Sequence, residues 1–389
     1  MKNREIHGYN SIPVSDTHIH IVFPKSPEET VSILRKFNNH MEYDSITVQT
    51  LTRCTGHRDL DPSNSLKGLY VKSALNSELG DFAYTYGSIF HYLDGRDTAE
   101  SYLRQAEELY ALGVDGYKFL DGKPGIRKML GKPLCDPIFD KMYAFIEEHG
   151  MPVKLHLADP AKFWGPKETM TETAIKRGWW CGDGSFPKRE EFYEELFSIM
   201  KKFPRLKLCL AHLGYMTYDE AVAFLEDYPN TSFDLTPGAS WCKNATEDPA
   251  LWREFIIKYS DRIFFGTDTY NIIEGEDCEA GYERSCSRYN TVRGMLEFPP
   301  ERTIHYGGDI GDLTPIELDT DTLERIYYKN VRALLGKPRE VTPASFIKAA
   351  EEMKALYAQG AFAEMPPEEC EDEIRHLDYM ISFFKGQKA

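Results

Sequence analysis

The sequence predicts an α/β protein whose strands close into a (β/α)8 barrel. Short runs rich in β-branched and aromatic residues alternate with longer segments in which apolar residues recur every three or four positions. The predicted strands number eight, and they cover residues 14–20, 45–50, 84–91, 115–120, 152–158, 206–212, 231–236 and 262–268. An open doubly wound sheet is the alternative, but no GxGxxG turn follows the first strand.

Helical periodicity fills most of the intervals between these strands. Each helical segment repeats apolar residues at three- and four-residue spacing, and several segments end at Gly or Pro, which stop helices. The expected helices are residues 27–40, 97–113, 136–150, 189–204, 218–229 and 248–260. This alternation is typical of a parallel sheet whose strands are connected by helices.

Two long insertions and a tail depart from the alternation. Residues 159–190 and 269–303 are rich in aromatic residues, and loops of this length are usually lids or binding loops. We expect them to form an aromatic lid over the end of the barrel, with packing against a neighbouring subunit as the alternative. Residues 1–336 should form the barrel domain. Residues 337–389 should form a helical C-terminal extension packed on the barrel or on a neighbouring subunit.

Composition and charge exclude several classes of protein. A net charge of −16 over 389 residues argues against nucleic acid as a partner, because phosphate binding needs a basic surface. The chain has no apolar run long enough for a membrane-spanning helix. The 8 cysteines form no CxxC pair, and the first residues lack the apolar core of a signal peptide. We therefore expect a cytoplasmic protein with reduced thiols that acts on a small molecule.

The first predicted strand carries a pair of histidines. Its sequence, VSDTHIH, separates His18 from His20 by one residue, so both side chains project from the same face of the strand. Two imidazoles side by side on a rigid strand can reach one metal ion. Taken alone, the pair is equally consistent with two hydrogen-bonded histidines that bind no metal.

Other predicted strands also end in residues that suit a metal site. Strands four, five, six and eight carry Lys118, His156, His212 and Asp268. The carboxyl ends of barrel strands meet at one rim, where active sites are built. One polar residue among apolar neighbours is usually a satisfied core group, but five or six on one rim are hard to explain by packing. Neutral imidazoles with a carboxylate favour Zn²⁺, or another divalent transition metal such as Mn²⁺, over Mg²⁺ or Ca²⁺.

In their order along the chain, these motifs resemble those of the amidohydrolase superfamily. The closest resemblance is to its amidohydrolase-2 branch, which includes decarboxylases and lactonases. The resemblance rests on the HxH of strand one and on VKLHLADP, CLAHLG, IFFGTD and LERIYYKNVRALLG, and it covers residues 13–336. It implies a metal-dependent enzyme built on a TIM barrel. Family habit, together with the extra tail, implies a homo-oligomer.

The resemblance also implies a role for each residue on the rim. The implied metal ligands are His18, His20, His156 and Asp268. With one metal, His212 would act as a base and polarise the metal-bound water, whereas with two metals it would itself be a ligand. A carboxylated Lys118 would bridge a metal pair; otherwise Lys118 would bond the ligands or a substrate carboxylate. One metal is favoured over two.

The expected chemistry depends on the metal and on one carboxylate beside it. A divalent metal lowers the pKa of bound water from 15.7 toward about 7, which yields hydroxide at neutral pH. Asp268 can accept that proton and pass it to a leaving group as a general acid–base. The metal also polarises the carbonyl under attack and so stabilises the oxyanion that develops.

Residues that contact the substrate are predicted on the same rim. Arg53 follows strand two and could grip a carboxylate through two hydrogen bonds, although a surface ion pair would explain it equally well. His91 ends strand three. Trp164 and Trp241 lie on loops above the rim and could form walls for a planar or cyclic substrate, although such residues more often pack lids.

Two reactions fit this set of residues. The leading hypothesis is a metal-dependent hydrolase that cleaves an amide, lactone or ester-like bond in a small, carboxylate-bearing molecule. The alternative is a non-oxidative decarboxylase of an aromatic or unsaturated acid that uses the same metal site. Some decarboxylase relatives replace the first histidine of HxH by Glu, and this chain keeps His18, which favours hydrolysis.

Overall fold

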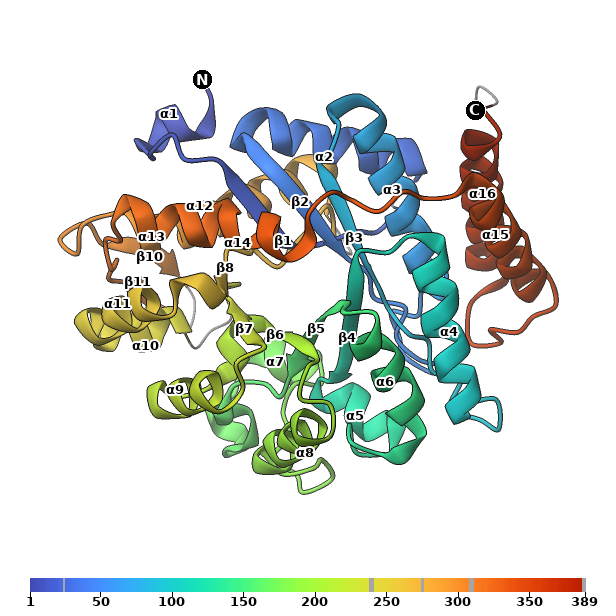
Figure 1. The fold of residues 1–389 in the computed structure, drawn as a ribbon, viewed down its shortest axis with the longest axis horizontal. Helices are drawn as coiled ribbons and strands as arrows, with labels where there is room; N and C mark the ends of the chain where they lie inside the picture. Colours follow the sequence, from blue (N-terminus) through green and yellow to red (C-terminus); the bar gives the residue numbers. More distant parts are fainter. Residues whose placement is uncertain (24, 238–240, 274–275, 308–310, 387–389) are drawn as a thin grey trace.

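Parallel strands form one curved sheet, and helices surround it on the outside (Figure 1). The computed structural model describes residues 1–23, 25–237, 241–273, 276–307 and 311–386. The strands of this sheet are β1 (Val14–His20), β2 (Tyr43–Gln49), β3 (Ala83–Gly87), β4 (Gly116–Gly122), β5 (Pro152–Leu157), β6 (Lys207–Leu210), β7 (Thr231–Asp234), β8 (Ile263–Phe264) and β9 (Thr269–Tyr270).

The sheet closes through the segment that contains its last two strands. Neighbouring strands pair in the order β8-β7-β6-β5-β4-β3-β2-β1-β9. At one end of the segment β8 pairs with β7, and at the other end β9 pairs with β1. Between them, the amide of Thr17 donates a hydrogen bond to the carbonyl of Phe265 at 3.0 Å. Residues 263–270 therefore occupy the eighth strand position, which confirms the predicted (β/α)8 fold class.

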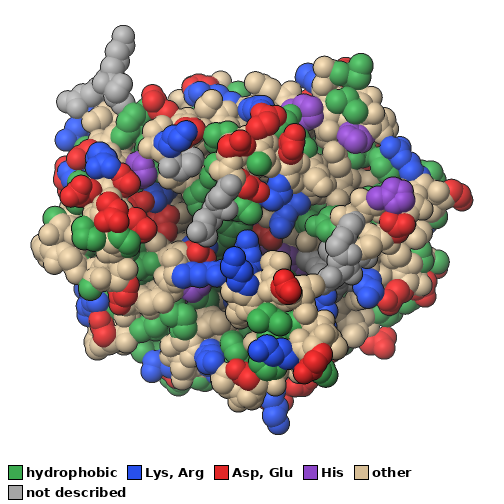
Figure 2. All heavy atoms as spheres, turned by 180° about the vertical axis from the view of Figure 1, so that it is seen from behind, with side chains coloured by type: hydrophobic (Ala, Val, Ile, Leu, Met, Phe, Trp, Pro, Cys, Tyr) green, Lys and Arg blue, Asp and Glu red, His purple; other side chains and the backbone are tan. Residues whose placement is uncertain are grey.

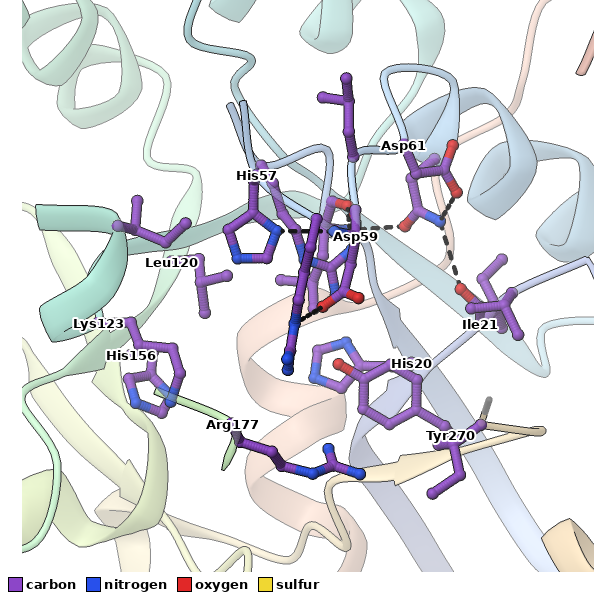
Figure 3. Close-up of a pocket in the computed structure, with 18 of the residues that line it drawn as sticks. His20, Ile21, His57, Asp59, Asp61, Leu120, Lys123, His156, Arg177 and Tyr270 are labelled. Atoms are coloured by element: carbon purple, nitrogen blue, oxygen red, sulfur yellow. Dashed lines mark hydrogen bonds and ion pairs between the residues drawn. The ribbon is translucent and has the colours of Figure 1, made fainter. Parts of the chain in front are cut away.

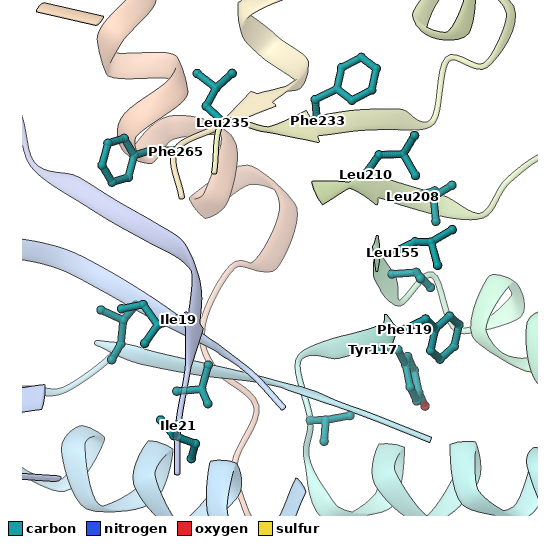
Figure 4. Packing of buried hydrophobic residues seen from close by; sticks show 14 of the residues in the cluster. Ile19, Ile21, Tyr117, Phe119, Leu155, Leu208, Leu210, Phe233, Leu235 and Phe265 are labelled. Carbon is teal, nitrogen blue, oxygen red and sulfur yellow. The ribbon is translucent and has the colours of Figure 1, made fainter. Parts of the chain in front are cut away.

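The apolar core lies between the strands and the helices around them. Ile19 and Leu155 are buried on the outer side of the sheet, as Figure 4 shows for these and other strand residues. Because side chains alternate along a strand, the neighbouring residues His18 and Lys154 point into the barrel. Both are buried there. The interior near the rim is thus polar, whereas the apolar packing that holds the fold together lies outside it.

The six predicted helices are present, with small shifts at their ends. They are α2 (Pro27–Met41), α4 (Ala99–Leu112), α6 (Asp140–Glu148), α8 (Arg189–Lys202), α9 (Tyr218–Asp227) and α11 (Pro249–Lys258). Shorter helices are α1 (Asn3–His7), α5 (Pro124–Leu130), α7 (Glu172–Lys176), α10 (Trp241–Glu247), α13 (Thr320–Glu324) and α14 (Asn330–Leu335). Single tight turns of helix cover Pro137–Phe139, Ala161–Trp164, Lys167–Thr169, Ala211–Tyr215 and Ser260–Arg262, and a wider π-helical turn covers Arg325–Lys329. Strands β10 (Ile304–Gly307) and β11 (Gly311–Leu313) pair in a separate antiparallel hairpin.

Two long helices are not predicted by the sequence, α3 (Asn64–Leu79) and α12 (Cys278–Glu297). α3 is buried over most of its surface, including Lys72, so its apolar residues follow no single face. α12 buries polar positions such as Arg293 and therefore carries little apolar periodicity. Residues 269–303, which the sequence predicts as an aromatic lid, consist mostly of this helix, and α12 packs against α2 and β9.

The C-terminal extension forms a pair of helices, α15 (Pro343–Ala358) and α16 (Pro367–Phe384). They pack on each other, and they contact α4 and α2 respectively. Tyr70 of α3 meets Tyr379 and Phe383 of α16 edge-on, with ring centroids 6.0 and 5.2 Å apart. The pair covers one side of the barrel (red in Figure 1). Within the described part of the chain, no helix is both long and apolar enough to cross a membrane.

Candidate metal centre

A large cavity opens at the carboxyl ends of the barrel strands. Its volume is about 1420 Å³. Figure 2 shows this face, with basic side chains gathered around a hollow. The basic residues that line the cavity are Lys25, Arg53, Arg58, Lys67, Lys118, Lys123, Lys176, Arg177, Arg284 and Arg288. The acidic ones are Asp59, Asp61, Asp159, Asp268, Glu369, Asp372 and Glu373. Cations outnumber carboxylates here although the whole chain is strongly acidic, so the local electrostatic potential favours anions.

Three of the predicted metal ligands meet inside this cavity. Ligand atoms of His18, His20 and Asp268 all lie within 4.8 Å of one another. The Nε2 atoms of the two histidines are 3.1 Å apart. Oδ1 of Asp268 lies 3.2 Å from Nε2 of His20 and 3.7 Å from Nε2 of His18. Both histidines come from β1, and the carboxylate directly precedes β9. The pairing of β9 with β1 therefore assembles the cluster.

Hydrogen bonds at the far side of each ring orient the two histidines. Nδ1 of His18 bonds Oδ2 of Asp234 at 2.8 Å, and Nδ1 of His20 bonds the carbonyl of Gln49 at 2.6 Å. Because both partners are acceptors, each Nδ1 carries the proton. Each Nε2 then presents its lone pair to the cluster, which is the arrangement that metal-binding histidines require.

Burial keeps the histidines of this region uncharged. It lowers the pKa of His18, His20 and His212, and it lowers the pKa of His156 to about 3. A neutral imidazole is the form that binds a metal ion. At neutral pH the ring nitrogens are thus available as ligands.

Asp268 stays ionised despite its burial. Burial raises the pKa of its carboxyl group, but the hydrogen bond with His20, the nearby ring of His18 and the charge of Arg288 bring that pKa well below its ordinary value. Nη1 of Arg288 lies 2.5 Å from the Asp268 carbonyl and 3.2 Å from its Oδ2. Two neutral imidazoles and one carboxylate within reach of a single point fit a divalent transition metal.

Lys118 lies against the same cluster. Its Nζ is 3.2 Å from Nε2 of His18, and the side chain is almost fully buried. Burial, together with the nearby charge of Lys154, lowers the pKa of Lys118 to about 8. A lysine of this kind loses its proton readily. Lys118 is therefore placed to bond a ligand or a substrate, and it is chemically able to be carboxylated.

His156 and His212 form a second pair beside the cluster. Their rings are 5.1 Å apart, and the ring of His212 lies 5.8 Å from that of His18. Nε2 of His156 faces Asp159 at 3.2 Å, and Nδ1 of His212 bonds the hydroxyl of Thr236 at 2.8 Å. The structure thus brings both histidines to the cavity, but neither belongs to the group of three ligand atoms within 4.8 Å.

Unusual backbone conformations turn three site residues into the cavity. Arg53, His212 and Asp268 have φ angles of 62°, 57° and 53°, in the left-handed region that most residues avoid. Such strain concentrates where side chains must be aimed at a ligand. Next to them, Gly266 allows a close approach, because a Cβ there would lie 2.8 Å from Thr236 and 3.1 Å from the Cβ of His18. The glycine of FFGTD thus lets the eighth strand position approach β1.

Basic side chains line the wall on both sides of the cluster. Nη1 of Arg53 bonds the carbonyl of Asp59 at 2.6 Å. Nζ of Lys123 lies 3.3 Å from both carboxylate oxygens of Asp159. Figure 3 shows Arg177 reaching across the cavity toward Tyr270. Guanidinium and ammonium groups of this kind can bind carboxylates.

The insertion at 159–190 contributes to the mouth of the cavity. Its residues that line the cavity are Asp159, Thr173, Lys176, Arg177, Gly178, Trp179 and Cys181. Trp179 stacks on Phe163 with ring centroids 6.1 Å apart, and Lys123 lies 5.8 Å over the same indole. This insertion therefore places one aromatic residue, Trp179, at the cavity.

The structure places three predicted substrate-binding residues outside the described wall of the cavity. Both ring nitrogens of His91 are engaged, by Asp121 at 2.7 Å and by the hydroxyl of Tyr102 at 3.0 Å. The indole of Trp164 donates to the carbonyl of Pro187, and its ring packs on Phe192. Trp241 is buried in the apolar core, where its indole donates to the carbonyls of Leu235 and Thr236.

Sequence reasoning missed Asp234, the carboxylate that orients His18. It is completely buried at the end of β7 and also accepts hydrogen bonds from Nζ of Lys154 at 2.8 Å and from the amide of His212 at 2.9 Å. Its position within TSFDLT, between two apolar residues, is a signal that could have found it. Arg288 was also missed, because the path of α12 decides whether its side chain reaches Asp268.

Comparison with known proteins places the chain in a family. The model of the amidohydrolase-2 family, described as amidohydrolase, matches residues 85–337. No curated protein matches significantly. Similar solved structures include a TIM-barrel protein from Bordetella bronchiseptica, with 14% identity, TM-score 0.49, and coverage of 83% of this chain and 98% of that one. Another is 4-oxalomesaconate hydratase from Rhodopseudomonas palustris, with 14% identity, TM-score 0.47, and coverage of 88% of this chain and 98% of that one. A third is a 2,6-dihydroxybenzoate decarboxylase, with 13% identity, TM-score 0.46, and coverage of 83% of this chain and 99% of that one. The family match spans more than half of the chain, which therefore belongs to the amidohydrolase-2 family.

Proposed function

We propose that this protein is a metal-dependent hydrolase that cleaves an amide, lactone or ester-like bond in a small, carboxylate-bearing molecule. The observation that carries the proposal is the convergence of His18, His20 and Asp268 within 4.8 Å, in a cavity rich in cations. Each imidazole has its Nδ1 held by a hydrogen-bond acceptor, so both Nε2 lone pairs face the same point. This arrangement is typical of metal-binding histidines, and packing alone would not require it.

The residues that would hold the metal are His18, His20 and Asp268, with His156 and His212 beside them. A bound zinc or manganese ion supplies Lewis acidity and makes water nucleophilic at neutral pH. The outer oxygen of Asp268, Oδ2, faces Arg288 at 3.2 Å. The carboxylate can hold a proton taken from the attacking water and return it to the leaving group.

The remaining residues bind and orient the substrate. His212 is neutral and its Nδ1 is engaged by Thr236, so its ring is held next to His18 and can accept a proton at Nε2. Arg53, Arg177 and Lys123 would grip the carboxylate of the substrate. The insertion with Trp179 would cover the mouth of the cavity and limit the access of water.

A non-oxidative decarboxylase is the second candidate, and one observation favours it. Nζ of Lys118 lies 3.2 Å from a predicted metal ligand, which places a cation where a carboxylate could bind at the cluster itself. A carboxylate held there would be the group that leaves as CO₂. In the hydrolase, by contrast, Arg53 or Arg177 would hold the carboxylate farther along the wall. The carbonyl of the bond to be cleaved could then lie at the cluster.

An experiment with two substrate panels separates these reactions. The zinc-loaded protein is incubated with lactones, amides and esters that carry a carboxylate, and in parallel with hydroxybenzoates, with CO₂ detected directly. Turnover in the first panel without CO₂ release supports hydrolysis. Release of CO₂ from the second panel alone would reject hydrolysis in favour of the second candidate.

We expect replacement of Arg53 or Arg177 by Met to raise the KM about tenfold or more while kcat changes less, because a charge-assisted grip on the substrate is lost. The check is steady-state kinetics on the best substrate and on its analogue without the carboxylate. The variants should lose discrimination between the two. Arg96→Met, at an exposed residue paired with Asp94, is the matched control. Unchanged discrimination in both variants would contradict this role.

Metal stoichiometry tests whether Lys118 bridges two ions. With one metal, elemental analysis should find one zinc per chain in both the wild type and Lys118→Met, because the three ligands remain. The variant should still lose activity if Lys118 contacts the substrate. Two zinc ions in the wild type and one in the variant would instead show a carboxylated lysine between a metal pair.

A further inference from the structure

Residues beyond the family match form part of the cavity wall. The family model ends at residue 337, yet Met365, Glu369, Asp372, Glu373 and His376 line the cavity. All but Met365 belong to α16. One side of the substrate space is therefore built by the C-terminal extension and not by the matched part of the barrel.

Glu373 joins this extension to the loop that follows β2. Its Oε2 accepts a hydrogen bond from the hydroxyl of Ser63 at 2.6 Å, and its Oε1 lies 2.7 Å from Nζ of Lys67. Lys67 is 3% exposed and also pairs with Asp61 at 2.9 Å. A buried ammonium group between two carboxylates holds both in place, because an unpaired charge at this depth is costly.

The same network continues from this loop to the ends of β1 and β2. Asp61 accepts a hydrogen bond from Nδ2 of Asn64 at 2.8 Å. Asn64 in turn accepts from the amide of Leu51 at 2.8 Å and donates to the carbonyl of Ile21 at 3.3 Å. Ile21 directly follows the metal-ligand candidate His20. Figure 3 shows Asp61 and Ile21 with these bonds drawn.

The extension also touches the segment after β1 directly. The ring of His376 lies 5.5 Å from that of Phe23 at a steep angle, and its Nε2 is 3.4 Å from the carbonyl of Lys25. Nζ of Lys67 lies 5.4 Å over the same Phe23 ring. Two loops of the cavity wall, one after each of the first two strands, are thus fastened to α16.

We propose that α16 is a specificity-determining part of the active site, and that Glu373 is the positioning residue through which it acts. Glu373 fixes the loop of residues 51–64 and, with it, Arg53, which has a left-handed backbone and whose guanidinium donates to the carbonyls of Leu51 and Asp59. The extension thereby sets the distance between a carboxylate-binding group and the metal ligands. This inference rests on the proposed function, in which Arg53 binds the substrate.

The test compares Glu373→Gln with the wild type and with Asp378→Asn. The Gln variant should fold, because Lys67 keeps its pair with Asp61. Asp378, on the same helix, is exposed and pairs with Lys354, so its variant is the matched control. We expect Glu373→Gln to raise the KM about tenfold with little change in kcat and no change in zinc per chain. The control should match the wild type.

Hydrogen exchange provides a readout that needs no activity. In Glu373→Gln the amides of residues 51–64 should exchange several-fold faster, since local opening becomes easier, while those of β5 and β6 stay protected. A lower melting temperature with unchanged KM and unchanged exchange in 51–64 would overturn the inference and leave the proposed function standing. If no substrate is turned over at all, the proposed function fails, and exchange still decides whether Glu373 positions the loop.

Discussion

Replacing His20 by Ala should remove the metal and lower kcat/KM by about 10³-fold or more, because the ion supplies most of the activation of water. His20 provides one of two imidazole nitrogens that lie 3.1 Å apart, and its Nε2 also faces Asp268 at 3.2 Å. Without it the remaining ligands cannot complete the coordination of a zinc ion. The measurement is zinc per chain after dialysis, together with kinetics in saturating zinc.

The fold should survive this change, since the apolar core lies on the other side of the sheet. A suitable control is His305→Ala, which removes an exposed histidine paired with Asp312 at 2.8 Å on the separate hairpin. That variant should keep its zinc and its activity. If His20→Ala retained both a full complement of zinc and wild-type kinetics, the metal centre assigned here would be wrong.

Replacing Asp234 by Ala should have the second largest effect, and it should act on stability and metal affinity together. Its carboxylate accepts from His18, Lys154 and the amide of His212, all without access to water. Although burial raises the pKa of this carboxyl group, Lys154 and His18 bring it well below its ordinary value. Loss of the carboxylate leaves an uncompensated buried ammonium group, which typically costs about 3–5 kcal/mol. Loss of the partner of a metal-binding histidine lowers metal affinity by roughly 10–100-fold.

A double variant separates the two effects. In Asp234→Asn with Lys154→Met, no buried charge is left unpaired, so the free energy of unfolding should recover most of what Asp234→Ala loses. Zinc affinity should remain low, because Asn does not hold Nδ1 of His18 as a carboxylate does. Chemical denaturation of the metal-free proteins and zinc titration are the two measurements. Full recovery of zinc affinity in the double variant would show that Asp234 acts only on stability.

The sequence allows prediction of the elements with a simple burial pattern. Many outward-facing residues of the strands are apolar, and residues such as Ile19 and Leu155 mark their strands clearly. α3 and α12 could not be recognised in this way. Both bury polar as well as apolar side chains, so their apolar residues do not recur on one face of the helix. Periodicity detects a helix only when one side of it meets water.

The candidate site shows the same limit. His18, His20 and Asp268 are predictable because strand ends of a barrel share one rim, whatever the loops do. Trp241 was expected to face that rim, but α10 begins with it and directs its indole into the core. The positions of Arg177 and Glu373 depend on the paths of a loop and of a terminal helix, and no local pattern specifies those paths.

The closure of the barrel by residues 263–270 has a kinetic consequence. Its hydrogen bond from Thr17 to Phe265 joins segments about 250 residues apart along the chain, and contacts between distant segments form late because ordering the intervening chain costs entropy. His18 and His20 come from one of these segments and Asp268 from the other. Under the proposed function, a refolding chain thus has no complete metal site until these two segments have met. We therefore expect high-affinity uptake of the ion to follow the meeting of these segments, so that the ion cannot template the steps before it.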